Sequence, residues 1–306
     1  MTNSTSPQGK SISPTALDSA CQCDARNLYE KAGAPGYSPF AAGAIALGAA
    51  VHDAVRAIHE TGDAGASGKA MVRDKPVAEV ARRITEVCRE RFPFADVWAV
   101  EQRFAFYCDV NHSVFQRGRI DYAPFSEGRC DAVIDLKTKS KVSPKLGDTL
   151  VSQDMNRQLF ACAIACMVHS RAVALGSRQP ADRPELGTWE NPVPYAVVAD
   201  AIEHAPLPEV WLLIWDKDHN RPVWRAHYIS RAALREHLRL AQRKALIVLQ
   251  YADKPPAEWP RSFNCADPWE CPHKMRCASD LADPPEDAEE YAADLALVRL
   301  GRANHP

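Results

Sequence analysis

The stretch from Gly118 to Lys139 constrains the fold most, because its pattern predicts two β-strands joined by a tight turn. Ile120 and Tyr122 alternate with polar neighbours, as residues do in a strand with one buried face. Glu127-Gly128-Arg129 predicts the turn, and the apolar run at 132–134 predicts the second strand. We therefore expect a hairpin whose two strands lie side by side.

Three polar side chains fall on this hairpin: Asp121 on the first strand, and Asp135 and Lys137 on the second. Residues two positions apart on a strand project from the same face, so Asp135 and Lys137 are expected to point the same way. Charged groups at the end of an apolar strand are costly to desolvate without a role. Two carboxylates can hold Mg²⁺ or Mn²⁺ through oxygen ligands, and a lysine beside them can orient water or neutralise charge on a phosphate. An ordinary surface ion pair is the alternative interpretation.

The composition is that of an ordinary globular protein, with 46% hydrophobic and 25% charged residues among 306. This length suits one large domain or two small ones. The formal net charge of -2 provides no global basic field, so a polyanion would have to meet a local basic patch. No run approaches the ~18 apolar residues of a membrane span, and the N-terminus has no apolar signal region. We expect a cytoplasmic protein without a membrane partner.

The order of the expected elements predicts a mixed α/β protein: a helical region, three strands, a helix and two more strands. The helices expected at 76–92 and 231–251 have apolar residues at helical spacing. The expected divisions are a disordered N-terminus at 1–10, a single domain at 11–278 and an acidic tail at 279–306. Within the domain we expect a helical part at 11–95, a sheet core at 96–230 with a Pro-rich excursion at 178–208, and a long helix with a cysteine-rich loop at 231–278.

Three of the ten cysteines crowd a short C-terminal segment, where Cys265, Cys271 and Cys277 are spaced six apart. Such a loop favours a metal or cluster site, although reduced surface thiols are the simpler alternative. Zinc held by the three cysteines and His273 is one possibility, since tetrahedral zinc accepts such ligands. An iron–sulfur cluster needs four thiolates, so its fourth would come from elsewhere in the chain.

Several motifs in the same order resemble the RecB-like branch of the PD-(D/E)XK nuclease superfamily. The hairpin carries D-(x)13-D-x-K, the run L-G-A-A-V-H-D-A-V matches the G-x-x-x-H helix motif, and S-P-T-A-L-D-S-A-C-Q-C-D-A-R-N-L-Y-E resembles the N-terminal signature. The resemblance implies a restriction-endonuclease-like αβββαβ core with a mixed central sheet. It also implies a 4Fe-4S cluster that staples the termini together, with these ligands: Cys23, Cys265, Cys271 and Cys277.

The resemblance further assigns roles to individual residues. The catalytic set would be Asp121, Asp135 and Lys137. Mg²⁺ or Mn²⁺ would be held by His52, Asp121, Asp135 and the main-chain carbonyl of Leu136. Auxiliary or DNA-contacting roles fall on Glu101, Gln158, Arg119 and Lys139. Taken alone, His52 would more often be a satisfied core histidine, and Glu101 is equally well explained as a surface charge on an edge strand. The helix motif Q-x-x-x-Y is matched at Gln158, but its tyrosine position is occupied by Cys162.

The function implied is a Mg²⁺- or Mn²⁺-dependent deoxyribonuclease, more an exonuclease than an endonuclease, in DNA processing, recombination or repair in a bacterial, archaeal or phage-infected cell. DNA that is single-stranded or has free ends would be its substrate, with a helicase, recombinase or single-strand-annealing protein as a further partner. The local basic patch would come from these residues: Arg117, Arg119, Lys139, Lys141 and Lys145. Two alternatives from other classes are a catalytically silent DNA-binding scaffold and a zinc-stabilised interaction module.

Overall fold

The computed structural model describes residues 10–13, 17, 28, 39–139, 156–181, 183–251, 253–255 and 258–259. The chain divides into two compact units. The first comprises Met1–Leu17 with Ser38–Ala245, and the second comprises Asp18–Tyr37 with Leu246–Pro306. The elements described below belong to the first unit, apart from the end of the last helix.

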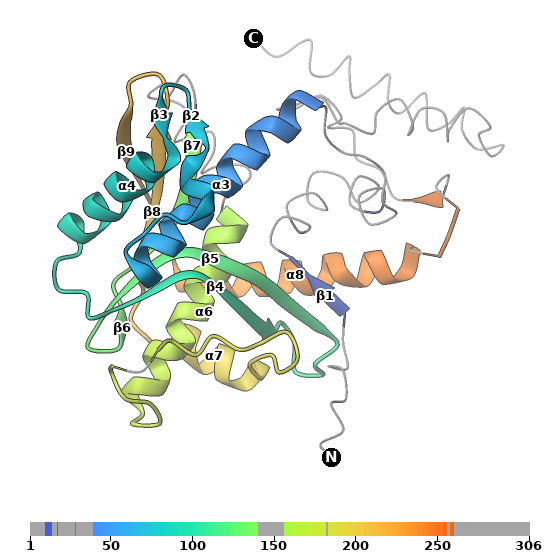
Figure 1. Cartoon of the computed structure of the whole chain (residues 1–306). Helices are drawn as coiled ribbons and strands as arrows, with labels where there is room; N and C mark the ends of the chain where they lie inside the picture. The colour runs from blue at the N-terminus through green and yellow to red at the C-terminus, as the bar shows by residue number, and fades with distance from the viewer. Residues whose placement is uncertain are drawn as a thin grey trace, which may run out of the picture. The chain divides into compact units, whose positions relative to one another are not determined.

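The described residues form a mixed seven-stranded sheet (Figure 1). Its strands are β1 (Lys10–Ile12), β4 (Val97–Tyr107), β5 (Val114–Ser126), β6 (Arg129–Cys130), β7 (Ala132–Lys139), β8 (Glu209–Asp216) and β9 (Arg221–His227). Antiparallel pairs join β4 to β5, β5 to β7 and β8 to β9, whereas β7 and β8 run parallel, as do β1 and β5. A separate small ribbon pairs β2 (Met71–Val72) with β3 (Lys75–Pro76). The prediction of a mixed α/β fold is therefore confirmed.

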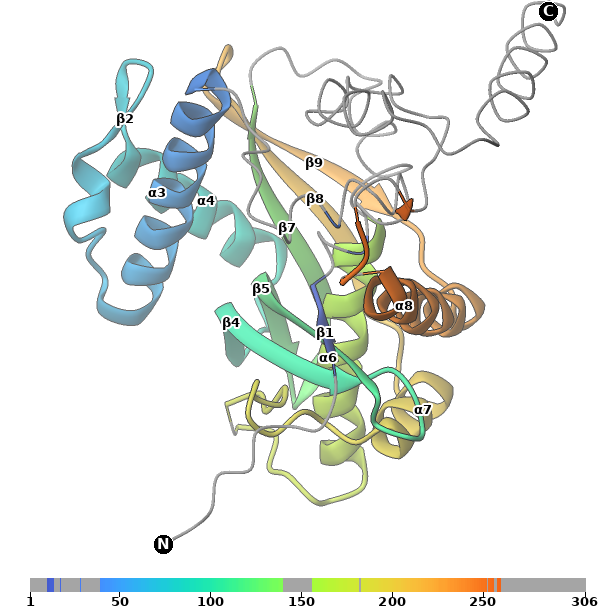
Figure 2. The same ribbon diagram turned by 90° about the vertical axis from the view of Figure 1, so that its right-hand side faces the viewer.

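Helices cover both faces of the sheet. Figure 2 shows α3 and α4 on one face, and α6 and α7 on the other. The helices are α3 (Pro39–Thr61), η1 (Ala66–Lys69), α4 (Val77–Arg91), α6 (Asn156–Ala174), α7 (Tyr195–His204) and α8 (Arg231–Tyr251). The ranges of α4 and α8 agree with those expected from helical spacing. Among the helices in the described residues, none is both long and apolar enough to cross a membrane.

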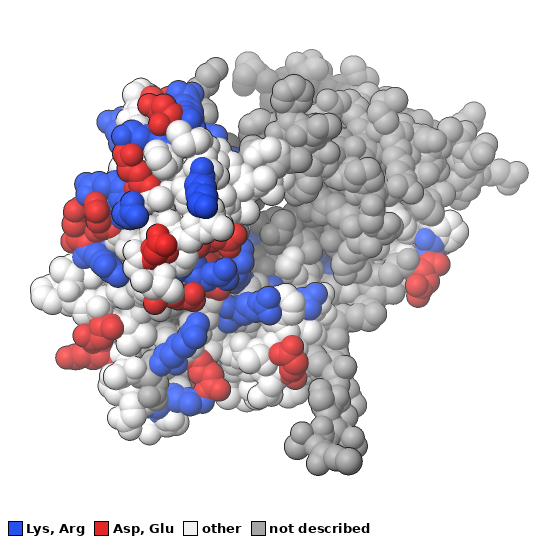
Figure 3. All heavy atoms as spheres, viewed as in Figure 1, with Lys and Arg blue, Asp and Glu red and all other residues white. Residues whose placement is uncertain are grey.

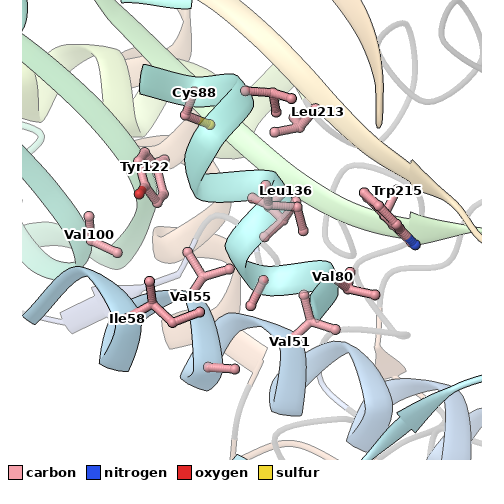
Figure 4. Packing of buried hydrophobic residues seen from close by; sticks show 14 of the residues in the cluster. Val51, Val55, Ile58, Val80, Cys88, Val100, Tyr122, Leu136, Leu213 and Trp215 are labelled. Carbon is pink, nitrogen blue, oxygen red and sulfur yellow. The ribbon is translucent and has the colours of Figure 1, made fainter. Parts of the chain in front are cut away.

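The core beneath α3 and α4 fixes how α3 lies on the sheet. Val51, Val55 and Ile58 recur at helical spacing along α3 and are buried. They pack with residues of α4 and the strands, including these: Val80, Cys88, Tyr122, Leu136, Leu213 and Trp215 (Figure 4). Each fully buried side chain of this kind contributes about 1.5–3 kcal/mol. Because Val51 is held in this core, the adjacent His52 is brought against residues of β4, β5 and β7.

The hairpin predicted from the sequence is present, and its turn has the expected chemistry. Glu127 and Gly128 both have positive φ angles, 51° and 75°. Positive φ at both central residues belongs to the type I′ turn, whose twist matches that of the flanking strands. The turn returns the chain through Ser126 and Arg129, which pair across it. Asp121 on β5 and Asp135 on β7 are thereby placed on neighbouring strands.

The Pro-rich segment at 178–208 is more ordered than the sequence analysis predicted, because it contains α7. Pro194 directly precedes the helix, and buried Val198, Ala201 and Ile202 recur at helical spacing. Before the helix, the chain runs beside β4: the Ala105 amide donates to the Leu186 carbonyl, and the Val193 amide donates to the Ala105 carbonyl. The segment therefore covers part of the edge of β4, although its local sequence is rich in proline.

A buried histidine between β5 and α8 should make the fold sensitive to acid. His237 is 3% exposed, and its Nε2 lies 2.7 Å from Oε1 of Gln116. Burial, with a smaller contribution from Arg157, lowers the pKa of His237 from 6.5 to about 3. Below pH 6.5 the unfolded chain binds a proton that the folded chain excludes, so stability falls with pH until about pH 3.

At pH 5 this histidine should lower the free energy of unfolding by about 2 kcal/mol relative to neutral pH. Urea unfolding at several pH values measures the loss. The His237→Gln variant keeps an N–H donor toward Gln116 but cannot titrate, so its stability should fall less steeply over the same interval. Parallel pH profiles for the two proteins would contradict this account.

Candidate metal and catalytic site

Three side chains from three elements converge beside the middle of the β4–β5 ladder: His52 of α3, Glu101 of β4 and Asp121 of β5. Nδ1 of His52 lies 2.5 Å from Oε1 of Glu101 and 3.8 Å from Oδ1 of Asp121. One ligand atom from each residue lies within 4.8 Å of the other two. We call these three residues the acidic cluster. Its donors are spaced closely enough to surround one cation.

Hydrogen bonds to both ring nitrogens place a positive charge on His52. Nδ1 contacts the Glu101 carboxylate, and Nε2 lies 3.2 Å from the main-chain oxygen of Leu136. Both partners are acceptors, so both nitrogens must carry a proton to donate. Burial, the largest single effect, lowers the pKa of His52, but Asp121 and Glu101 together raise it to about 9. The proton on Nδ1 thus occupies the place that a metal cation bound by the cluster would take.

Glu101 is held in an unusual backbone conformation at the centre of the site. Its φ is 49°, a left-handed value that is uncommon for residues other than glycine. On either side of it Val100 pairs with Tyr122 and Gln102 with Ile120, while Glu101 itself drops out of the ladder. Such strain persists only where surrounding contacts enforce it, and it often marks functional positions. Its side chain is 2% exposed and lies between His52 and Arg119, whose Nε is 2.6 Å from Oε2.

The hairpin adds a second charged pair beside the acidic cluster. Oδ2 of Asp121 accepts a hydrogen bond of 2.9 Å from the main-chain amide of Leu136. On the two sides of Leu136, Asp135 and Lys137 form an ion pair with Nζ 3.0 Å from Oδ2. The Asp135 side chain is 2% exposed and that of Lys137 is 29% exposed. The carboxylate is therefore buried, whereas the ammonium group can reach a molecule bound at the surface.

Burial and neighbouring charges together set the pKa values of Asp135 and Lys137. It raises the pKa of Asp135, and Asp121 raises it further, while Lys137 and His52 oppose the shift. The neighbouring carboxylates of Asp135 and Asp121 raise the pKa of Lys137, outweighing its own burial, so Lys137 is charged. The site therefore combines the carboxylates of Glu101, Asp121 and Asp135 with the cationic groups of His52, Arg119 and Lys137, and Arg119 and Lys137 are partly exposed.

The residues present suit a divalent metal ion. The acidic cluster offers an imidazole nitrogen and carboxylate oxygens, whereas the Leu136 carbonyl oxygen faces Nε2, the ring nitrogen turned away from the two carboxylates. Carboxylate and carbonyl oxygens suit Mg²⁺ and Mn²⁺, and an imidazole ligand favours Mn²⁺ over Mg²⁺. Among the described residues, Oε2 of Glu101 and Oδ2 of Asp135 are buried without a hydrogen bond of good geometry. Each of these oxygens nevertheless lies beside a side-chain cation, Arg119 for Glu101 and Lys137 for Asp135, so a bound metal ion would have to share or replace that pairing.

The structure brings together most of the predicted site residues. His52, Asp121, Leu136 and the Asp135–Lys137 pair all meet here, and Arg119 reaches Glu101.

The other two residues predicted for auxiliary or DNA-contacting roles are Gln158 and Lys139. Gln158 lies on α6, half-buried, one turn before Cys162. The carboxylates of Asp121 and Asp135 help to raise the pKa of the Cys162 thiol, after burial, so this face of α6 lies near the acids. Lys139 is exposed at the end of β7.

Some residues predicted for the cysteine site and for the basic patch lie outside the described residues. These are Cys23, Cys265, Cys271 and Cys277, together with Lys141, Lys145 and His273. The predicted cluster or zinc site therefore stays a prediction. Glu101 was equally well explained from the sequence as a surface charge, but the structure buries it and makes it a member of the acidic cluster.

No family model matches this chain, and no curated protein matches it at a significant level.

Proposed function

We propose that this protein is a divalent-metal-dependent nuclease of the RecB-like branch of the PD-(D/E)XK superfamily. The observation that carries the proposal is the convergence of His52, Glu101 and Asp121 within reach of one cation, beside the Asp135–Lys137 pair. A structural ion pair would not require two further buried carboxylates and a protonated histidine in the same place. Charged groups gathered and buried in this way are typical of functional sites.

The order of elements around the site supports the same proposal. In chain order the elements are α4, β4, β5, the two-residue β6, β7, α6, α7 and β8, and β8 runs parallel to β7. Without β6 and α7, this order agrees with the αβββαβ core that the sequence resemblance implies. The proposed catalytic residues lie on the second and third strands of that core, where the D-(x)13-D-x-K pattern places them.

In phosphodiester hydrolysis a water oxygen forms a bond to phosphorus while the bond to one ester oxygen breaks. A bound divalent cation would lower the pKa of a water molecule and neutralise charge on the phosphate. Lys137, charged and partly exposed, would stabilise the negative charge that develops on the phosphate oxygens. Asp135 holds the Lys137 ammonium in position, and Arg119 holds Glu101 toward His52. DNA is the substrate we propose, because it is the substrate that the resemblance to RecB-like nucleases implies.

The function is tested by incubating the purified protein with end-labelled single-stranded and double-stranded DNA and with circular DNA. We expect cleavage with Mn²⁺ or Mg²⁺ and loss of at least about a hundredfold of the rate when a chelator removes the metal. Cleavage of linear but not circular DNA would identify an exonuclease. If the protein binds DNA but cuts none of these substrates with either metal, it is the silent scaffold and the proposal is wrong.

The predicted cysteine site can be tested in the same preparation. A 4Fe-4S protein purified without oxygen is brown, whereas a zinc protein is colourless. Measurement of the iron and zinc content of the full chain then decides between a 4Fe-4S cluster and a zinc ion. We retain the 4Fe-4S cluster as part of the proposal, with Cys23, Cys265, Cys271 and Cys277 as its ligands.

A further inference from the structure

A groove of about 510 Å³ leads along the edge of β4 to the acidic cluster. It is lined by Arg56 and Glu60 of α3, by residues 100–103 of β4, which include Glu101, and by residues 183–190. A molecule lying in this groove would therefore have one part beside the acidic cluster and another beside the 183–190 segment.

The side chain of Trp189 lines this groove and packs against two arginines. The ring centroid of Trp189 lies 4.7 Å from Cζ of Arg103 and 4.4 Å from Cζ of Arg117. These arginines come from neighbouring strands, since Arg103 pairs with Arg119 and Ala105 with Arg117. Trp189 also packs against the buried cluster of Ala105, Tyr107 and Phe115. These contacts hold the half-buried ring in place, and Trp189 is among the residues that line the groove.

The groove is lined by charges of both signs. We therefore expect it to bind nucleic acid by stacking of a base more than by general attraction to a polyanion. Figure 3 shows Lys and Arg side chains in a row where β4 and β5 cross the view, with acidic side chains close by. Arg56, Arg103 and Arg183 line the groove, but so do Glu60 and Glu190. Glu185 is paired with Arg178. A groove of mixed charge binds a nucleic acid best where an aromatic ring can take up a base.

We propose that this groove binds single-stranded nucleic acid, with a base stacked on Trp189 and the backbone phosphates near Arg103 and Arg56. This inference rests on the proposed nuclease function and names the form of substrate that reaches the same site. Stacking on a single tryptophan requires a base that is not already paired and stacked in a duplex. Arg103 and Arg117 support the ring through cation–π contacts. The Trp189 platform, meaning Trp189 with Arg103 and Arg117, thereby selects single strands over duplex DNA.

The test is a binding titration that needs no cleavage. Fluorescence anisotropy of a labelled oligo(dT) strand and of a labelled blunt duplex is measured with the full chain in buffer without divalent cations. Trp189→Ala should weaken binding of the single strand by about tenfold, and Trp189→Phe should retain most of it because a phenyl ring still stacks. The matched control is Trp224→Ala, which removes a half-buried tryptophan that also packs against an arginine, Arg91, but lies outside the groove.

A second variant guards against loss of folding. Arg103 is exposed, so Arg103→Gln should leave thermal unfolding unchanged and weaken single-strand binding severalfold. If Trp189→Ala and Arg103→Gln bind oligo(dT) as tightly as the wild type, the platform is not a binding site and this inference is wrong. That result would leave the nuclease proposal standing, because metal-dependent cleavage is measured separately. Conversely, Trp189-dependent binding by a protein that cleaves nothing would retain the platform and remove the nuclease.

Discussion

Replacing Asp121 by asparagine is expected to slow metal-dependent DNA cleavage by about a thousandfold or more, because one carboxylate of the acidic cluster is lost. The asparagine side chain keeps one oxygen that can accept the hydrogen bond from the Leu136 amide, so the hairpin should fold normally. Cleavage rates at saturating Mn²⁺, together with the melting temperature, measure the two effects separately. The expected result is a large loss of rate with little loss of stability.

The matched control for this change is Asp131→Asn. Asp131 lies on the same hairpin and is half-buried, but its carboxylate contacts Ser126 and Arg129, away from the acidic cluster. We expect its cleavage rate to stay within about threefold of the wild type. Equal losses in both variants would show that the effect comes from the hairpin as a whole, and a wild-type rate for Asp121→Asn would remove Asp121 from the site.

The second large effect is expected for Lys137→Met, which removes a partly exposed cation of the site. Its loss should reduce the turnover rate by about 100- to 1000-fold while changing the apparent substrate affinity much less, since the ammonium acts on charge that develops during reaction. Asp135 would then lose its partner, but burial already raises the pKa of this carboxyl. It can therefore take up a proton, and the fold should survive.

Steady-state rates over a range of DNA concentrations separate turnover from affinity. Lys217→Met serves as the control. Lys217 comes directly after β8, the strand that pairs with β7, and among the described residues it does not contact the acidic cluster. A Lys137→Met protein with an unchanged turnover rate would exclude the proposed role. Loss of affinity alone would reassign Lys137 to substrate binding.

The sequence predicted the hairpin and two of its neighbouring helices because those features depend on local periodicity. Alternation along the strand places Asp135 and Lys137 on one face, and the turn at Glu127–Gly128 brings Asp121 alongside. His52 could be placed near them only through the resemblance, because the local sequence pattern of α3 does not show which part of the sheet this side chain contacts. The packing of Val51 and Val55 decides that position.

Glu101 and Trp189 were harder to assign for different reasons. The burial of Glu101 depends on a left-handed φ and on pairing with both His52 and Arg119, and these are tertiary contacts that a single strand does not encode. Trp189 lies in a Pro-rich stretch without periodicity, and its position follows from contacts with β4 and β5 that are remote in sequence. The local signal for α7 was present in the spacing of Val198, Ala201 and Ile202, but the surrounding prolines obscured it.

The central claim is that His52, Glu101 and Asp121 bind one divalent cation. The most direct measurement is a titration with Mn²⁺ followed by electron paramagnetic resonance, in which free Mn²⁺ is quantified for the wild type, Glu101→Gln and Asp121→Asn. We predict saturable binding of Mn²⁺ by the wild type and at least about tenfold weaker binding by each variant, because each loses one carboxylate ligand. Mn²⁺ binding of the same strength and stoichiometry in all three proteins would contradict the claim.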